Sequence, residues 1–465
     1  MPVRPYLLAA AVVLAVASPA PAALADEPAA EPADAVLDPA GIAALEATAR
    51  RAGLRVLTGE HLVLITDRPE RPGDGVAELP AVFDAAWGTW CEHYAIDPAA
   101  HREWRACGCL IVDRERFRAA GLLPESVAEF TNGFCHRHRF WMADQSNPAY
   151  RRHLLLHEGV HAFTITLRSL DTPTWYTEGI AEYLATHRLA PPDATAMRRD
   201  GAGKFVPTPL PPRAEDVEQL GRIERIRGLR ESGDCPALGD VFAARAANHR
   251  DLSAYATSWA AVTLLQQHPD HAAMFTAVER GPLDAAFTRR LAAAAGWDDR
   301  RVTRDFDAFT DELDYGFDFT RSRIDWSPGR PLDDAATVTV AADRGWQHSG
   351  LRLERGRRYA VSAAGRCTIG AVPATPTTAA VTLQTEANGI SLRWYRGRPL
   401  GRLLVACWDD APVEGGRPRF RVLAEGATAT FTAAADGPVY TKLNAAPGDL
   451  ADHEGGIEVT FQPVP

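Results

Sequence analysis

The chain has 465 residues, of which 46% are hydrophobic and 24% are charged. This composition is typical of globular proteins and excludes a wholly disordered chain, a collagen and a coiled coil. The formal net charge of −10 argues against an electrostatic nucleic-acid binder, which needs an excess of basic residues on one face. We therefore expect a folded protein of at most about three domains with no nucleic-acid partner.

The first 25 residues have the pattern of a secretory signal peptide. Arg4 precedes a short apolar run, and Ala23-Leu24-Ala25 offers the small residues that signal peptidase requires. The apolar run is too short to span a bilayer stably. We predict a signal peptide at residues 1–25, a flexible linker at residues 26–40, and a secreted or periplasmic protein with no stable membrane span after cleavage.

The spacing of apolar residues predicts an α+β region at residues 41–325. Residues 151 to about 301 have mainly helical spacing, and Asn147-Pro148 forms the turn before the first helix of that stretch. Ahead of it we expect two helices and four strands. The helices are Ile42–Arg51 and Val76–Tyr94, and the strands are Arg55–Leu57, His61–Thr66, Cys109–Val112 and Arg137–Met142.

After Trp326-Ser327-Pro328-Gly329 the pattern changes to short alternating runs bounded by Gly, Pro and Asp. Such runs predict an all-β sandwich at residues 331–465. The predicted strands are Thr337–Ala341, Tyr359–Ala363, Ile390–Tyr395, Leu403–Trp408, Phe420–Leu423, Thr428–Ala433 and Ile457–Phe461.

Seven cysteines occur in the chain, and export would permit disulfides. Cys367 and Cys407 lie in the same C-terminal region and could pair. Cys107 and Cys109 lack the two-residue gap of a zinc knuckle, so each is interpreted as a disulfide partner or a buried thiol.

The sequence His157-Glu158-Gly159-Val160-His161 carries a His-Glu-x-x-His motif. On a helix, His157 and His161 are one turn apart on one face, so their imidazoles can bind one cation, and zinc suits them best. Glu158 is offset around the helix and can reach a water on the metal but not the metal itself. It is therefore the predicted general base. The alternative is a core helix with two solvated histidines.

A segment with two glutamates, Glu178 and Glu182, follows the motif and begins at Thr174, 13 residues after His161. A catalytic zinc needs a third protein ligand, which Glu178 could supply. Glu182 lies one helical turn further along the same face, where it could accept a proton from a ligating imidazole and orient that imidazole. For this pair the alternative is a solvated acidic face.

The pair HEGVH and WYTEGIAEY resembles the gluzincin metallopeptidases, in particular the bacterial peptidase MA-like group. The resemblance implies a thermolysin-like zincin fold, Zn²⁺ bound by His157, His161 and Glu178, and Glu158 as general base. Tyr255-Ala256-Thr257-Ser258 is similar to the family's Y-x-x-G element, with serine in place of glycine, which makes Tyr255 a candidate oxyanion donor. His187 is an alternative donor.

Cys135-His136-Arg137-His138 also contains metal-binding residue types. Their alternation predicts a strand on which His136 and His138 share a face. Either this strand holds a second metal, or it borders the cleft and binds an extended peptide through its backbone.

The C-terminal region resembles the galactose-binding-like sandwich of calcium-dependent bacterial lectins. Gly345-Trp346, Asn444-Ala445-Ala446-Pro447-Gly448-Asp449 and Asp452-His453 fall in the order of that family. Ala445 stands at a position that is acidic in those lectins, and Asp452-His453 replaces an Asn pair, which argues against a calcium site. We expect a structural or substrate-docking sandwich whose ligand is a glycan or a protein.

These observations lead to a predicted secreted zinc peptidase, with endopeptidase activity on peptide or protein substrates. The alternative is a non-catalytic secreted binding protein that combines a zincin scaffold with a ligand-binding sandwich. Zinc content and the effect of Glu158→Gln on hydrolysis discriminate between the two.

Overall fold

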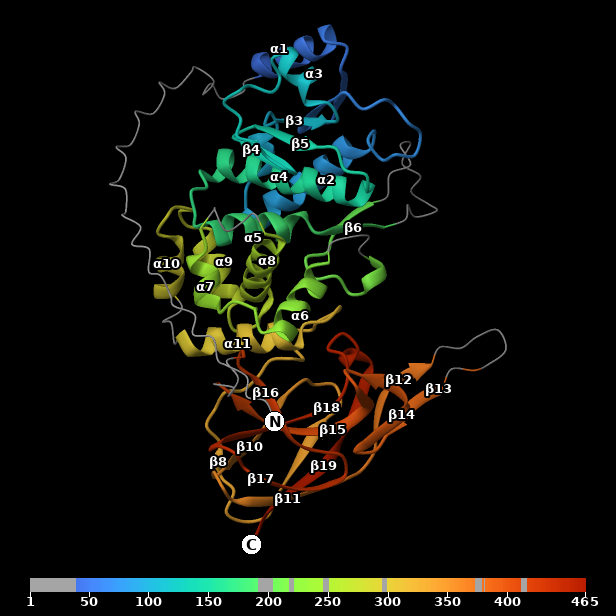
Figure 1. The fold of residues 1–465 in the computed structure, drawn as a ribbon, viewed down its shortest axis with the longest axis vertical. Coiled ribbons are helices and arrows are strands. Elements are labelled where there is room, and N and C mark those ends of the chain that lie inside the picture. Colours follow the sequence, from blue (N-terminus) through green and yellow to red (C-terminus); the bar gives the residue numbers. More distant parts are fainter. Residues whose placement is uncertain are drawn as a thin grey trace, which may run out of the picture.

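The computed structural model describes residues 39–190, 204–216, 221–245, 251–294, 299–372, 379, 381–410 and 416–465. The predicted signal peptide at residues 1–25 and most of the predicted linker lie outside these ranges. Figure 1 shows three tiers: an N-terminal sheet with helices, a helical middle, and a β-rich C-terminal part. The described chain is therefore helical and stranded in its first two thirds and built of strands in its last third.

The N-terminal tier is organised around a five-stranded mixed sheet with the order β1-β2-β3-β5-β4. Its central pairs are parallel and its two edge strands are antiparallel to their neighbours. Four of the strands lie within a few residues of the predicted ones: β1 Arg55–Thr58, β2 Leu62–Thr66, β3 Ala106–Ile111 and β5 Arg139–Ala143. The fifth, β4 Gly133–His136, was not predicted as a separate strand.

Helices cover both faces of this sheet. Alternate residues of a strand point to opposite faces, so each strand contributes apolar side chains to two separate cores. Leu62 and Leu64 belong to the core shared with α2 (Leu79–Tyr94) and α4 (Pro148–Arg168). Val63 and Ile65 belong to a separate core on the other face, shared with α1 (Pro39–Arg51) and α3 (Arg114–Ala119). The tier therefore has three layers, and its sheet is buried on both sides (Figure 1).

The prediction of a single strand through Cys135–His138 is wrong. Strand β4 ends at His136, Arg137 adopts a left-handed conformation with φ of 55°, and β5 begins at Arg139. The register pairs His136 with Arg139, so Arg137 and His138 form a tight turn. His136 and His138 therefore do not share a strand face.

The middle tier carries the predicted helical stretch, together with one hairpin that the sequence analysis did not predict. Strands β6 and β7 pair antiparallel, from His187 opposite Pro207 to Ala190 opposite Lys204. The elements are α4 Pro148–Arg168, α5 Thr174–Ala185, β6 His187–Ala190, β7 Lys204–Pro207, α6 Arg222–Ser232, α7 Leu238–Ala243, α8 Leu252–Gln267, α9 Ala272–Glu279, α10 Phe287–Ala294 and α11 Asp299–Glu312.

The C-terminal part forms two six-stranded sheets, with the orders β14-β15-β18-β10-β8 and β13-β12-β19-β11-β17; β16 pairs with β15, and β9 pairs with β19. Buried residues of both sheets belong to one hydrophobic core. All seven predicted strands are present, whereas β8, β10, β12, β13 and β18 were not predicted. The bounds are β8 Arg330–Pro331, β9 Ala336–Ala341, β10 Gln347–Leu353, β11 Arg358–Ala364, β12 Cys367–Val372, β13 Val381–Thr385, β14 Asn388–Tyr395, β15 Arg398–Asp409, β16 Arg419–Glu425, β17 Thr428–Thr432, β18 Gly437–Leu443 and β19 His453–Val464.

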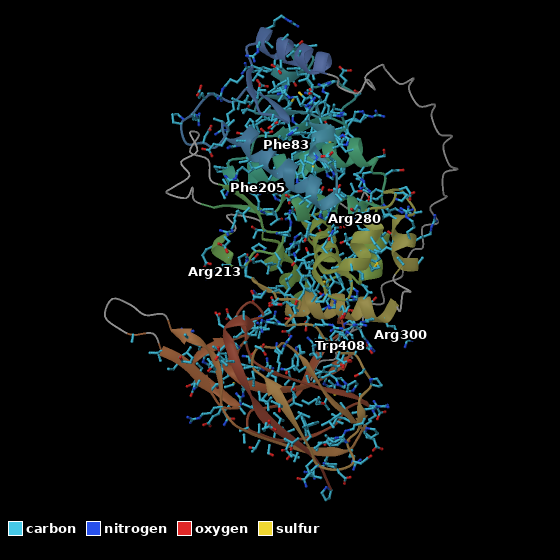
Figure 2. All side chains as sticks on the ribbon, turned by 180° about the vertical axis from the view of Figure 1, so that it is seen from behind. Phe83, Phe205, Arg213, Arg280, Arg300 and Trp408 are labelled. Carbon is cyan, nitrogen blue, oxygen red and sulfur yellow. The ribbon has the colours of Figure 1, made fainter. Side chains whose placement is uncertain are left out.

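A smaller apolar cluster joins α11 to the C-terminal strands. Ala308 of α11 packs there with Trp346, Phe420 and Tyr440. Trp408 lies at the same junction (Figure 2), where its ring centroid is 5.0 Å from that of Phe420. The helical tier and the strands therefore meet through aromatic packing.

All seven cysteines are free thiols. The suggested pairing of Cys367 with Cys407 is therefore wrong, because Cys367 lies in β12 of one sheet and Cys407 lies in β15 of the other. Cys107 and Cys109 are buried in β3, which confirms the interpretation as buried thiols over that as disulfide partners.

Among the described residues, no helix combines the length and the apolar composition needed to cross a membrane.

Candidate metal centre

The His-Glu-x-x-His motif lies in the middle of α4, a helix of 21 residues. Its first turn is capped by Asn147, whose side chain accepts hydrogen bonds from the backbone N–H groups of Ala149 and Tyr150. Pro148 follows at the first helical position, where the absence of an N–H group costs nothing. Leu155, Leu156 and Phe163 are fully buried, as predicted for the side of the helix that packs on the core.

The structure brings the three predicted metal-ligating side chains together. His157 Nε2 lies 3.1 Å from His161 Nε2. Glu178 Oε2, from α5, lies 3.3 Å from the first of these nitrogens and 3.5 Å from the second. Ligands held about 2.0–2.1 Å from a tetrahedral zinc ion are about 3.3 Å apart, so the three atoms have the spacing that such an ion requires.

The environment of Glu178 also fits a bound cation. Glu178 Oε2 is buried and makes no hydrogen bond within the described part of the chain. Burial by itself raises the pKa of this carboxyl, but the imidazoles of His161 and His157 outweigh burial and hold the pKa well below its ordinary value. The carboxylate is therefore charged and directed at two nitrogen ligands, as a metal ligand must be.

Glu158 lies beside this group and touches strand β4. Its side chain is buried, and burial raises the pKa of its carboxyl, while His157 and His161 act in the opposite direction. A Cβ atom at Gly133 would overlap Glu158 Oε1, so only glycine fits opposite this carboxylate. Gly133 could not be identified from the sequence, because its contact with Glu158 depends on how α4 packs on the sheet edge.

Two glycines of the motifs permit close helix packing. A Cβ at Gly159 would lie 2.5 Å from Phe83 and 2.8 Å from Trp90 of α2, and a Cβ at Gly179 would lie 2.5 Å from the backbone oxygen of Ser258 in α8. All three distances are shorter than real Cβ atoms show to a neighbouring atom. These glycines therefore set how closely α2 approaches α4 and how closely α8 approaches α5.

Tyr255 stands in the first turn of α8, and its ring centroid is 6.0 Å from that of His157. Burial raises the pKa of its hydroxyl, and the charges of Glu178 and Glu158 raise it further, so the phenol stays protonated at neutral pH. The alternative donor, His187, has other partners among the described residues: Ala185, Arg152 and the ring of Phe205. The structure thus brings Tyr255 beside a predicted ligand, whereas these contacts of His187 are with other residues.

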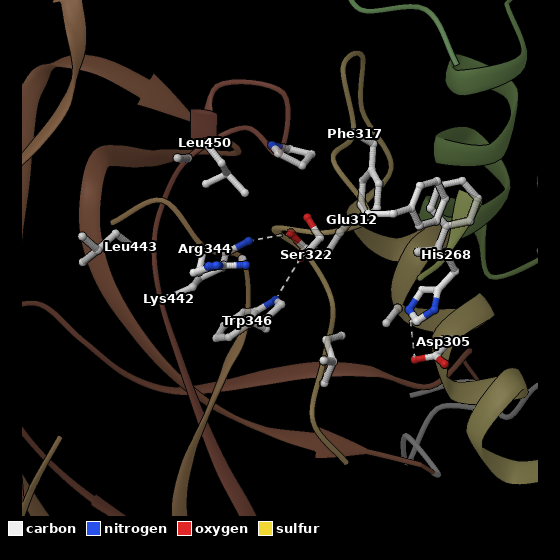
Figure 3. Close-up of a pocket in the computed structure, with 17 residues that line it drawn as sticks. His268, Asp305, Glu312, Phe317, Ser322, Arg344, Trp346, Lys442, Leu443 and Leu450 are labelled. Atoms are coloured by element: carbon white, nitrogen blue, oxygen red, sulfur yellow. Dashed lines mark hydrogen bonds and ion pairs between the residues drawn. The ribbon is translucent and has the colours of Figure 1, made fainter. Parts of the chain in front are cut away.

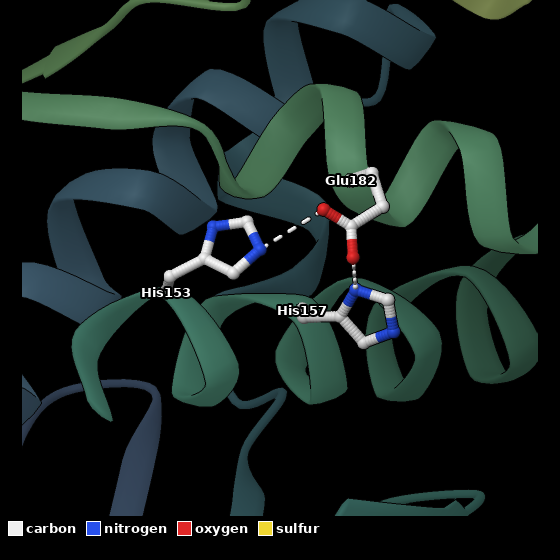
Figure 4. Close-up of side chains that lie close together, drawn as sticks. All are labelled: His153, His157 and Glu182. Atoms are coloured by element: carbon white, nitrogen blue, oxygen red, sulfur yellow. Dashed lines mark hydrogen bonds and ion pairs between the residues drawn. The ribbon is translucent and has the colours of Figure 1, made fainter. Parts of the chain in front are cut away.

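Glu182 lies on the opposite side of His157 from Glu178. Its Oε1 is 3.1 Å from His157 Nδ1, and its Oε2 is 3.0 Å from His153 Nε2 (Figure 4). His153 precedes His157 by four residues, so helical spacing could have identified it, although the sequence analysis did not. Arg222 of α6 forms an ion pair with Glu182 and was also missed, since nothing local in the sequence connects the two.

The described residues contain one further His and Asp cluster, away from the motif. His271 Nε2 lies 2.9 Å from Asp305 Oδ2, and Trp326 donates to Asp305 Oδ1 at 2.8 Å. His268 Nδ1 accepts the backbone N–H of Asp270, which leaves its proton on Nε2 and removes that nitrogen as a metal ligand. His136 and His138 belong to no group of three close ligands among the described residues, so their suggested second metal site lacks the donors it needs.

A small pocket lies between α11 and the C-terminal strands (Figure 3). Glu312 of α11 accepts hydrogen bonds from Lys442 Nζ at 2.5 Å and from Trp346 Nε1 at 3.2 Å. These contacts link the helical tier to the strands. None of the predicted catalytic residues lines this pocket.

No protein-family model and no curated protein matches the chain. Solved structures that match include the N-terminal domain of EclA, a PllA-like lectin, at 14% identity over 29% of this chain and 98% of that chain, with a TM-score of 0.19. IMPa from Pseudomonas aeruginosa in complex with an O-glycopeptide matches at 13% identity over 54% of this chain and 24% of that chain, with a TM-score of 0.17.

The IMPa metallopeptidase in complex with T-antigen matches at 10% identity over 88% of this chain and 42% of that chain, with a TM-score of 0.15. This chain therefore matches less than half the length of the IMPa chains. At these TM-scores the similarities establish neither the fold nor the function of this chain. Any assignment of function therefore depends on the geometry of the candidate metal centre.

Proposed function

We propose that this chain is a secreted or periplasmic zinc-dependent peptidase that hydrolyses internal peptide bonds of peptide or protein substrates. The observation that carries the proposal is the mutual spacing of His157 Nε2, His161 Nε2 and Glu178 Oε2, at 3.1, 3.3 and 3.5 Å. Zinc bound to these atoms would supply Lewis-acid chemistry to water and to the scissile carbonyl.

The protein side chains carry the proton transfers in this proposal. Glu158 accepts a proton from the attacking water and returns it to the leaving amine. Its burial raises the pKa of the carboxyl, which favours that return. Tyr255 donates a hydrogen bond to the oxyanion of the tetrahedral intermediate, since its hydroxyl remains protonated.

The proposal includes the domain organisation and the fold family. Residues 1–25 are the signal peptide, residues 26–40 a linker, residues 41–325 a gluzincin-like zincin domain and residues 331–465 a β-sandwich. Strand β4 lies at the edge of its sheet in the described part of the chain, next to Glu158, and we propose that an extended peptide binds there by strand addition. A glycan or protein ligand for the sandwich stays a prediction of the lectin resemblance.

Zinc analysis and a glutamate substitution test the proposal. The purified protein is expected to hold one zinc ion per chain and to cleave casein, and Glu158→Gln is expected to retain zinc while losing hydrolysis by about 10²–10⁴-fold. Glu92→Gln, on the exposed side of α2, is the matched control and should retain both the bound zinc and the hydrolysis of casein. Retained zinc without turnover on casein and on a random peptide library would instead favour a non-catalytic binding protein.

A further inference from the structure

A second group of metal-binding side chains lies next to the first. Ligand atoms of His153, His157 and Glu182 lie within 4.8 Å of one another, and all three residues are buried. Taken alone, this group resembles a second metal site that shares His157 with the first. A cation is already present there, however, because the Arg222 guanidinium pairs with Glu182.

Arg222 contacts two members of this group at once. It forms an ion pair with Glu182 Oε2, and its Nη2 lies 3.1 Å from His153 Nε2. Its side chain is only 13% exposed. Burial lowers the pKa of the guanidinium to about 10, so it remains charged at neutral pH.

The packing of α6 holds Arg222 in place. Arg222 is the first residue of this helix. One turn later, Arg225 donates to Ser253 Oγ at 2.8 Å and pairs with Asp251 at 3.2 Å. Asp251 and Ser253 begin α8, the helix that carries Tyr255. The start of α6 is therefore fixed to the same helix as the candidate oxyanion donor.

A carboxylate has two oxygens, and their partners decide its orientation. In Glu182, Oε2 is engaged by Arg222 and His153, which leaves Oε1 directed at His157 Nδ1, 3.1 Å away. The negative charge of a carboxylate this close favours the proton on Nδ1 and so leaves the lone pair of Nε2 for the metal, although Glu182 Oε1 and His157 Nδ1 do not have the geometry of a hydrogen bond. Without Arg222, only the contact with His153 would hold the Glu182 carboxylate in this orientation.

We propose that Arg222 is a positioning residue of the metal centre, which fixes Glu182 against His157 and denies the His153, His157 and Glu182 group to a second metal ion. This inference rests on the proposed zinc site. It predicts that Arg222 affects zinc affinity only through Glu182, and that the wild-type chain binds one ion.

The test measures zinc affinity by competition with a chromogenic chelator, on the purified full chain. We expect Arg222→Gln to weaken zinc binding by about 10–100-fold, the range typical of residues that orient metal ligands. Glu182→Gln should weaken it similarly, and adding Arg222→Gln to Glu182→Gln should change affinity by less than about twofold. The control is Arg227→Gln, which removes an ion pair with Asp314 from the same helix and should leave affinity unchanged. Should Arg222→Gln fail to fold, Arg222→Lys is compared with Arg227→Lys, because lysine keeps the charge but loses the planar guanidinium that contacts Glu182 and His153 together.

Three results would overturn the proposal: unchanged affinity in Arg222→Gln, equal losses in the Arg222 and Arg227 variants, or two zinc ions per wild-type chain. A merely structural role would lower affinity in both arginine variants and would add to the effect of Glu182→Gln. A wild-type chain that binds no zinc would instead refute the proposed function itself, so the two failures are distinguishable.

Discussion

Gly133 in β4 and Glu158 in α4 lie so close that a Cβ atom at position 133 would overlap the Glu158 carboxylate. The edge strand and the predicted general base are therefore in direct contact, although 25 positions separate them in the chain. The contact fixes where the carboxylate stands relative to the sheet edge that would bind a peptide.

Replacing Gly133 by alanine tests this relationship. The added methyl group should displace the Glu158 carboxylate, and a displacement of about 1 Å can cost about 10²-fold in rate. We expect Gly133→Ala to lower kcat by that order while leaving zinc content unchanged, as measured by peptide hydrolysis and metal analysis. Gly88→Ala in α2 is the control, because nothing lies within 4 Å of a Cβ there. Equal activity in Gly133→Ala and wild type would contradict the prediction.

Removing the Tyr255 hydroxyl tests the oxyanion donor. Loss of one such donor costs about 10²–10³-fold in kcat. We expect Tyr255→Phe to lower kcat by this amount with little change in KM or zinc affinity, in steady-state assays on a fluorogenic peptide. His187→Gln provides the comparison, since His187 contacts Phe205 and Arg152. A fall in kcat in the His187 variant alone would assign the role of oxyanion donor to His187 instead of Tyr255.

The Glu312–Lys442 pair should make stability depend on pH. Burial raises the pKa of Glu312, but Lys442 and Arg396 outweigh burial and lower it to about 2, from an ordinary 4.5. Because the pKa is depressed on folding, the stabilisation is complete above pH 4.5 and is lost as the pH falls toward 2. The depressed pKa of Glu312 corresponds to about 3 kcal/mol of stability of the folded protein.

Urea unfolding of wild type and Glu312→Gln across this pH range measures that effect. The variant should be less stable at pH 6 by about 2–3 kcal/mol, and the difference should narrow as the pH falls below 4.5. The exposed Glu354→Gln should change stability by less than about 0.5 kcal/mol. A constant difference between wild type and Glu312→Gln at every pH would show that the pair does not titrate in this way.

The seven cysteines should remain reduced thiols. Burial raises the pKa of Cys367 to about 11 and that of Cys407 to about 12, which makes both slow to oxidise or alkylate in the folded protein. We expect seven reactive thiols in denaturant without reductant, and a melting temperature that dithiothreitol does not change. Fewer than seven thiols would reveal a disulfide.

Much of the candidate site could be predicted from local spacing. His157 and His161 are four residues apart on one helix, so helical geometry alone places both imidazoles on one face. The antiparallel β1–β2 pair and the alternating C-terminal strands likewise follow from local periodicity. The tight turn at Arg137 was missed because no glycine or asparagine marks its left-handed residue.

The sequence by itself determined which side chains offer metal-binding atoms and that those of α4 share a helix face. The sequence also favoured Glu178 over Glu182 as the third ligand. Only the tertiary structure decided that Glu178 Oε2 lies within 3.5 Å of Nε2 of both His157 and His161, and that Arg222 and Gly133 contact the site. The physical reason is that helix periodicity fixes neighbours within about one turn of a residue. Contacts between positions 133 and 158, or 182 and 222, form only when separate elements pack together.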